Sequence, residues 1–164
     1  VVHNKNKPIL DSYKEDFGHG LEALAEDGNA AHLADWLEMK GYQSGVFGTA
    51  PLMPCHSYTF EIEAKAGEYL SFATMLVHTN DLFFSPDERG IRLFHGHRSM
   101  TGEITEYIGL WDAGTEVNEY PGAGIHQPAR LNGGIVEDGV VMPVDDEFTY
   151  PAVDDMIKVT ITKN

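Results

Sequence analysis

The chain is poor in cysteine and in basic residues, and each shortage excludes a class of protein. Its single cysteine, Cys55, cannot form a disulfide within the chain, so cysteine pairing says nothing about redox compartment. A lone cysteine is a thiol ligand, a nucleophile or, as we expect here, a small buried residue. Against 26 Asp and Glu stand 11 Lys and Arg, giving a formal charge of −15 over 164 residues. This charge repels nucleic acids and anionic membranes and attracts cations, although the solubility of an exported or salt-adapted protein explains it equally well.

Long apolar runs and enzyme signatures are also missing. No stretch of eighteen or more apolar residues occurs, so the sequence predicts no membrane span. No basic segment followed by an apolar one opens the chain, so we expect either a removed targeting segment or a cytosolic protein. The sequence lacks a nucleophile elbow, a P-loop and a dinucleotide-binding fingerprint. We therefore expect that the protein is not an enzyme, with glycosidase-type chemistry by paired carboxylates as the alternative.

The first quarter of the chain has the pattern of helices. Residues 1–17 look irregular and polar, whereas in residues 18–40 apolar side chains recur at the i, i+3 and i+4 positions of a helix. Gly28 and Asn29 interrupt this pattern. The sequence therefore predicts two short helices or one broken helix, with Asn29 as the N-cap of the second and Gly41 as its stop.

The remainder has the pattern of strands. Alternating or continuous apolar residues predict strands at residues 58–64, 69–79, 91–95, 103–111 and 156–162. Loops rich in Gly, Pro and Asp separate these strands, and strands and helices do not alternate. Together these features predict an antiparallel β-sandwich, a single domain over residues 1–164, with the helical segment as an excursion near the N-terminus.

Oxygen-bearing side chains follow two of the predicted strands. In LWDAGTE the strand stops at Asp112, and an Ala-Gly-Thr turn brings Glu116 back toward it. In TNDLFF the strand at 69–79 runs out into Asn80 and Asp81. If both strands end on the same side of the sandwich, three carboxylates meet there, and they repel one another unless a proton or cation lies between them.

Calcium is the cation that suits such a set, because it accepts six to eight oxygens in loose geometry. The alternative is that Asp and Asn at strand ends are simply turn formers. No EF-hand loop and no calcium-binding nonapeptide repeat is present.

Eight histidines offer a different kind of metal site, because imidazole suits copper and zinc. His95 and His97 occupy alternate positions of a predicted strand and would face the same side. His78 and His126 lie beside the two oxygen-rich loops, and His3 would chelate Cu(II) if the chain begins with a free amine. The alternative is that most of these histidines are surface or hydrogen-bonded residues.

The stretches NDLFF and WDAGTE, in that order, resemble the signature loops of the spondin N-terminal domain found in animal F-spondin. The segments GLEALAEDGN, PLMPCHSYTFEIEA and the closing VTIT also resemble bacterial spondin-domain proteins, so the resemblance covers residues 1–162. It implies an all-β fold, an antiparallel β-sandwich of about eight strands with C2-like topology and a calcium ion at one end.

The resemblance implies Asp81, Asp112 and Glu116 as the calcium ligands. Animal domains have Asp at the position of Glu116, so the longer arm changes the coordination here, and Glu119 becomes a substitute or additional ligand. The animal domains also carry cysteines that this chain lacks. They usually begin with a further strand, which suggests that the given chain is truncated, processed or incomplete, or that a neighbouring subunit supplies the strand.

The function implied is that of a secreted calcium-binding domain with a structural or adhesive role at the cell surface or in the matrix, with the periplasm as another location. Its partner would be an extracellular or surface ligand of unknown identity, an expectation that rests on analogy of fold. Two alternatives remain open. One is a surface protein that binds copper or zinc through histidines, and the other is a homo-oligomeric subunit of an extracellular polymer.

Overall fold

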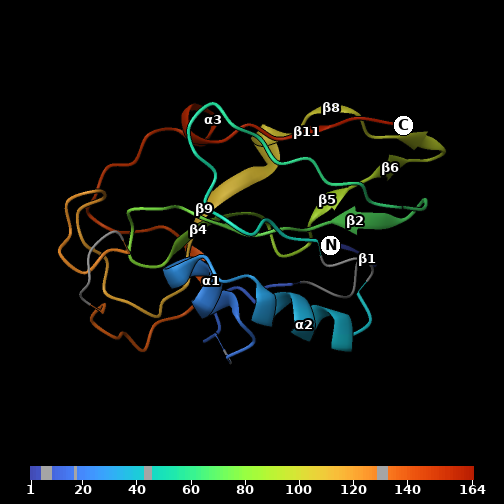
Figure 1. Ribbon diagram of the computed structural model, residues 1–164. Coiled ribbons are helices and arrows are strands. Elements are labelled where there is room, and N and C mark those ends of the chain that lie inside the picture. Colours follow the sequence, from blue (N-terminus) through green and yellow to red (C-terminus); the bar gives the residue numbers. More distant parts are fainter. Residues whose placement is uncertain (5–8, 17, 43–45, 129–132) are drawn as a thin grey trace.

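The computed structural model describes residues 1–4, 9–16, 18–42, 46–128 and 133–164. Within these ranges the strands are short and pair antiparallel, and helices are few (Figure 1). In chain order the elements are β1 (Val2–Asn4), α1 (Leu21–Asp27), α2 (Ala31–Met39), β2 (Glu68–Leu70), β3 (Thr74–Met75), β4 (Leu82–Pro86), β5 (Ile91–Arg92), β6 (Phe94–His95), β7 (Arg98–Ser99), β8 (Gly102–Glu103), the 3₁₀ turn η1 (Thr105–Tyr107), β9 (Ile108–Asp112), β10 (Met142–Pro143), α3 (Val153–Met156) and β11 (Thr160–Ile161).

A four-stranded sheet in the order β10-β9-β4-β3 lies at the centre. All five residues of β4 are buried. A strand that is covered on both faces is expected to have apolar residues at consecutive positions rather than at every second one. Its register with β9 runs from Leu82 opposite Asp112 to Pro86 opposite Ile108. The indole of Trp111 donates a 3.1 Å hydrogen bond to the carbonyl of Ser85, which fixes the ring across the strand pair.

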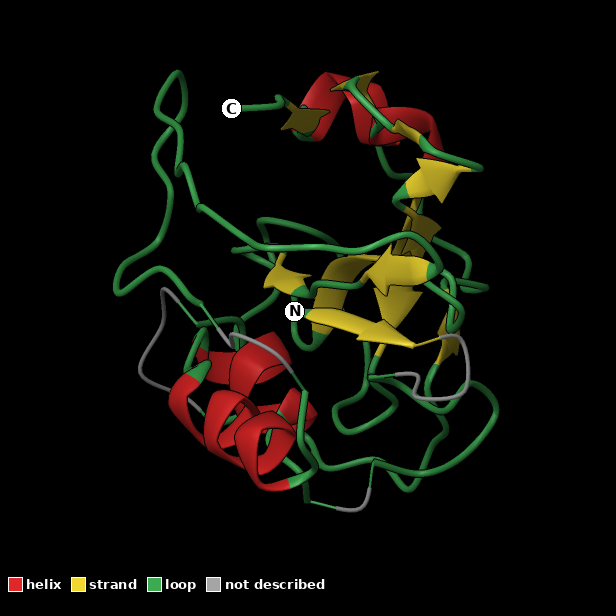
Figure 2. Cartoon of the chain, turned by 90° about the vertical axis from the view of Figure 1, so that its right-hand side faces the viewer, coloured by secondary structure: helices red, strands yellow, loops and turns green. Residues whose placement is uncertain are grey.

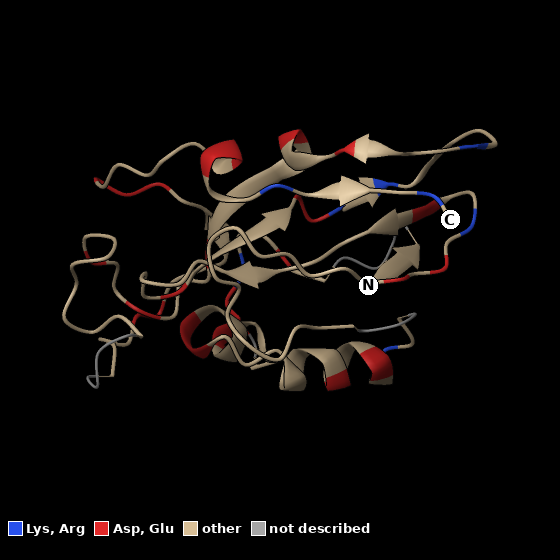
Figure 3. Ribbon diagram, turned by 45° about the horizontal axis from the view of Figure 1, so that its top comes forward, with Lys and Arg blue, Asp and Glu red and all other residues tan. Residues whose placement is uncertain are grey.

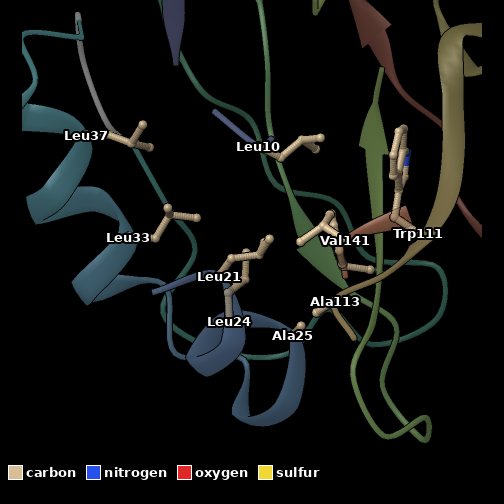
Figure 4. Close-up of a cluster of buried hydrophobic side chains, with 10 residues drawn as sticks. Leu10, Leu21, Leu24, Ala25, Leu33, Leu37, Trp111, Ala113 and Val141 are labelled. Carbon is tan, nitrogen blue, oxygen red and sulfur yellow. The ribbon is translucent and has the colours of Figure 1, made fainter. Parts of the chain in front are cut away.

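Smaller sheets surround the central one: β1-β2-β5, β11-β8 and the hairpin β6-β7. Helices α1 and α2 lie on one side of the strands, and α3 lies on the other (Figure 2). Leucines of α1 and α2 point toward Trp111 and Val141 and form the main hydrophobic cluster with them (Figure 4). This packing holds α1 against β3 and β4 of the central sheet.

The prediction of two short helices is confirmed. Gly28 ends α1 in the left-handed conformation, at φ 70°, where glycine is favoured, and Gly41 follows α2 at φ 78°. The N-cap position of α2 is Ala30 rather than Asn29. Asn29 still acts at the helix start, because its side-chain oxygen accepts a 3.2 Å hydrogen bond from the Ala31 amide.

Several predicted strands have different bounds. Residues 1–17 are not irregular throughout, because β1 pairs with β2. Residues 69–79 do not form one strand: the chain leaves β2 at Ser71, and β3 belongs to a different sheet. Residues 91–95 and 103–111 are likewise each divided between two strands.

Residues 58–64 alternate in sequence but form no strand, and most of their side chains are exposed, including Phe60 at 46 %. At the C-terminus, Met156 ends α3, and only residues 160–161 of the predicted strand at 156–162 pair with β8. The expected burial of Cys55 is also wrong, since this residue is exposed in a turn. Alternation alone is therefore a poor guide here, because a strand also needs a neighbour.

The chain is a β-rich protein with antiparallel sheets, as predicted. The finer prediction, a C2-like sandwich of about eight strands, stays a prediction. Among the described residues, no helix combines the length and apolar character that crossing a bilayer requires.

Candidate metal centre

The start of β4 and the end of β9 lie at the same edge of the central sheet, at the left in Figure 1. Asp81 directly precedes β4 and Asp112 ends β9, and the antiparallel register sets Leu82 opposite Asp112. The Ala113 amide also donates to the Asp81 carbonyl, at 3.3 Å. The structure therefore brings together these two carboxylates, which lie 31 positions apart in the sequence.

Asp81 is fully buried and only half satisfied. Its Oδ2 accepts hydrogen bonds from the Thr115 amide at 2.7 Å, the Thr115 hydroxyl at 3.1 Å and the Glu116 amide at 3.0 Å. Its Oδ1 has no hydrogen-bond partner among the described residues, although the residue is 0 % exposed. Burial raises the pKa of Asp81 and the charge of Glu116 raises it further, while the hydrogen bonds from Thr115 and Glu116 oppose this.

Asp112 lies partly buried beside it. Its Oδ1 accepts from the Gly114 amide and its Oδ2 from the Asn118 side chain, both at 2.6 Å. Burial raises the pKa of Asp112 to about 6, and the negative charge of Asp81 contributes to the rise. The carboxylate thus closes the turn that follows β9 and still faces a second negative charge.

The loop after Asp112 is held in place by residues 133–139. The Val117 amide donates to the Ile135 carbonyl and the Glu137 amide to the Thr115 carbonyl, each at 2.8 Å. The Glu116 carboxylate lies against Gly134, where a Cβ atom would collide with it. Burial raises the pKa of Glu116 as well. Glu116 is thus a third carboxylate here whose ionised form is less favourable than it would be in water.

Glu26 on α1 is a fourth carboxylate that the sequence analysis missed. Burial raises its pKa to about 7, with contributions from the charges of Glu116 and Asp81, while a hydrogen bond with the Thr115 side chain lowers it. That hydroxyl also contacts Asp81 at 3.1 Å, and its single hydrogen serves one carboxylate at a time. The sequence carries no signal for Glu26, because its burial depends on how α1 packs on the sheet.

Glu119, the additional ligand suggested by the sequence, turns its carboxylate toward His126. Its Oε2 accepts from the His126 amide and its Oε1 lies next to the His126 Nδ1, both at 2.9 Å. These bonds to His126 lower the pKa of Glu119, in contrast to the other carboxylates. Glu119 therefore bonds to His126, and its pKa is lowered where those of Asp81, Asp112 and Glu116 are raised.

The remaining histidines are dispersed. His95 and His97 do not alternate along one strand, because the chain reverses between them in the β6–β7 hairpin, where both are exposed. His3 is 5 % exposed, and its ring nitrogens contact the Ser71 hydroxyl at 2.7 Å and the Asn4 carbonyl at 2.8 Å. His78 is exposed in the turn after β3. No pair of these imidazoles comes from one strand face.

Between described residues, no Lys or Arg forms an ion pair with Asp81, Asp112 or Glu116. The ion pairs among the described residues are Lys14–Asp11, Lys158–Glu103 and His126–Glu119, none of which involves the site. The long loops at the left of Figure 3 are marked by acidic segments, whereas Lys and Arg appear mainly toward the other end. Buried carboxylates without a cation are unfavourable, because both burial and like charge oppose ionisation.

The donor set suits a hard cation, since carboxylate, hydroxyl and backbone oxygens are the ligands of calcium. In the described part of the chain, however, no three His, Cys, Asp or Glu side chains form a ready-made metal-binding group. The orphaned Oδ1 of Asp81 is the observation that fits an added cation. Asp112 and Glu116 are the carboxylates that could join Asp81 there, since the charge of Asp81 acts on Asp112 and that of Glu116 acts on Asp81.

Comparison with known proteins adds no further information about this edge. No family model, no curated protein and no solved structure matches the chain.

Proposed function

We propose that the chain is a secreted calcium-binding domain of the spondin N type, with a C2-like β-sandwich fold. Calcium binds between the start of β4 and the end of β9, with Asp81, Asp112 and Glu116 as ligands. The observation that carries this proposal is the fully buried Asp81, whose Oδ1 has no partner in the part of the chain that the structure describes. A buried anion with an unsatisfied oxygen and acidic neighbours is greatly stabilised by a divalent cation.

The arrangement of the resembling motifs supports the same proposal. NDLFF contributes Asp81 and β4, and WDAGTE contributes the end of β9 and the turn after it. These two stretches are neighbours in the central sheet, paired along the whole length of β4. Amides of Thr115 and Glu116 reach across to Asp81, so one motif positions the carboxylate of the other.

The role we propose for the ion is structural, and the biological role is adhesion at the cell surface or in the matrix. Without a cation, repulsion among the carboxylates pushes the loops apart, and calcium removes that repulsion. Extracellular modules bind calcium with dissociation constants of about 10⁻⁴–10⁻³ M, which matches the concentration outside cells. The adhesive role comes from the resemblance and is an analogy of fold.

A thermal melt of chelator-treated protein, with and without millimolar Ca²⁺, tests the proposal. Because millimolar Ca²⁺ is about one to ten times such a Kd, binding stabilises the folded state by about 0.4–1.4 kcal/mol. For a chain of this size that corresponds to a rise in Tm of about 1–5 °C. Asp81→Asn should remove the response, because it keeps the volume and loses the charge.

Asp35→Asn is the matched control, because Asp35 is exposed on α2. This variant should respond to calcium as the wild type does. Parallel melts with Cu²⁺ and Zn²⁺ test the histidine alternative. A response to copper or zinc and none to calcium would contradict the proposal.

A further inference from the structure

A buried amide pair joins the loop after the site to the beginning of β4. Gln127 is 0 % exposed and Asn80 is 1 % exposed, which is unusual for side chains with this many polar atoms. The Gln127 Nε2 donates to the Tyr120 carbonyl at 3.0 Å and lies 3.4 Å from the Glu119 carbonyl and 3.5 Å from the Asn80 Oδ1. One amide group thus bonds the Tyr120 carbonyl and lies between Asn80 and Glu119.

Asn80 completes the connection from the other side. Its Oδ1 accepts a 3.1 Å hydrogen bond from the Glu119 amide, and it directly precedes Asp81 in the chain. The loop packs closely over this pair: a Cβ atom at Gly124 would come within 2.7 Å of the Gln127 Nε2 and would collide with the Glu119 carboxylate. The segment from Glu119 to Gln127 is therefore fastened to the residue that neighbours the most buried carboxylate.

Two polar atoms of the pair have no hydrogen-bond partner among the described residues, namely the Asn80 Nδ2 and the Gln127 Oε1. A pair kept for stability alone would be expected to satisfy its buried groups, because an unpaired buried donor or acceptor is unfavourable. The Asn80 Nδ2 lacks a well-formed hydrogen bond, yet the Asn80 side chain lies near enough to Glu116 to oppose the rise in its pKa. The pair therefore reaches both acidic arms of the loop, the one at Glu116 and the one at Glu119.

We propose that Asn80 and Gln127 are positioning residues for the cation site, an amide latch that sets calcium affinity by holding residues 119–127 against the start of β4. This inference rests on the proposed function. The latch does not touch the cation. It fixes the backbone of residues 119–127, which continue the loop that carries Glu116, so that calcium binding does not require this part of the loop to be ordered.

The test compares Gln127→Ala with Ser71→Ala. Each variant removes one buried side chain with hydrogen bonds, but Ser71 contacts His3 between β2 and β1, away from the site. Calcium affinity is measured by isothermal titration calorimetry on the chelator-treated full chain. Hydrogen exchange at the amides of residues 120–124 reports whether the loop is held. Gln127→Glu is the second variant, because it keeps the volume and loses the Nε2 donor.

We expect Kd for calcium to rise at least tenfold in Gln127→Ala and Gln127→Glu, with faster exchange at residues 120–124. We expect Ser71→Ala to lose thermal stability and keep its Kd within about twofold. An unchanged Kd in either Gln127 variant, together with faster exchange, would make the latch purely structural and overturn the inference alone. A wild-type chain that ignores millimolar calcium would overturn the proposed function, and this inference with it.

Discussion

Replacing Asp112 with asparagine should have opposite effects with and without calcium. In the wild type, burial and the charge of Asp81 raise the pKa of Asp112 from 3.8 to about 6. At 1.36 kcal/mol for each pKa unit, ionising this group at pH 7.5 opposes folding by at most roughly 3 kcal/mol. Because the carboxylate is partly exposed, solvent screening reduces this to about 1 kcal/mol.

Asparagine removes the charge and keeps the local geometry. Its side-chain oxygen still accepts from the Gly114 amide, and the Asn118 amide can rotate to present its oxygen to the new NH₂ group. In chelator at pH 7.5, Tm should therefore rise by about 2–4 °C. With millimolar calcium the order should reverse, because the variant lacks a ligand and the wild type is stabilised.

Differential scanning calorimetry of both proteins, in EDTA and in CaCl₂, measures the two effects together. A variant that melts below the wild type in EDTA would show that Asp112 is not under electrostatic stress in the ion-free protein. A variant that keeps the full calcium response would remove Asp112 from the ligand set. Either result would refute the reasoning at a different step.

Three further changes test the fold and the charges. In chelator, the free energy of unfolding should fall as pH rises from about 4.5 to 7.5. The pKa values of Glu26 and Asp112 are raised to about 7 and about 6, so in this range the folded state binds more protons than the unfolded state. Urea titrations across this pH range measure the fall. Phe83→Ala should lose about 3–5 kcal/mol in the same titration, since Phe83 is 0 % exposed in the core. Gly114→Ala should destabilise more than Gly122→Ala, because both positions have φ near 70° but only at Gly114 would the new Cβ meet a backbone nitrogen, at 2.5 Å. Equal losses in their melts would exclude a close approach at Gly114.

The helices were predictable from the sequence, and most strand bounds were not. Helix periodicity with Gly28 and Gly41 at the ends is a local signal, and it fixed α1 and α2. Strand pairing is not local. Residues 58–64 alternate as a strand should, but no described strand lies beside them to pair with. The division at Ser71 follows from its bonds to Val1 and His3, nearly seventy positions away.

Asp81, Asp112 and Glu116 were identified by an argument that was partly wrong. The sequence suggested that two strands end on the same side, whereas Asp81 stands at the start of β4 and Asp112 at the end of β9. The error came from reading the apolar run Leu82–Pro86 as a loop, because a fully buried strand does not alternate. Antiparallel pairing brings a start and an end to one edge, so the same residues still meet. Glu26 depends on how α1 packs on the sheet, which no local pattern reveals.

The strongest alternative to a cation site is that these carboxylates simply keep an acidic protein soluble. Solubility requires charge at the surface, where water screens it, as for Asp35 on α2. Asp81 is 0 % exposed, its Oδ1 is unsatisfied, and its ionised form is disfavoured by burial and by Glu116. A buried charge contributes little to solubility and destabilises the fold when it stands alone. Protonation or a bound cation relieves this cost, and at pH 7.5 we expect the cation to do so. Removing one carboxylate should therefore stabilise the ion-free protein and destabilise the calcium-loaded protein.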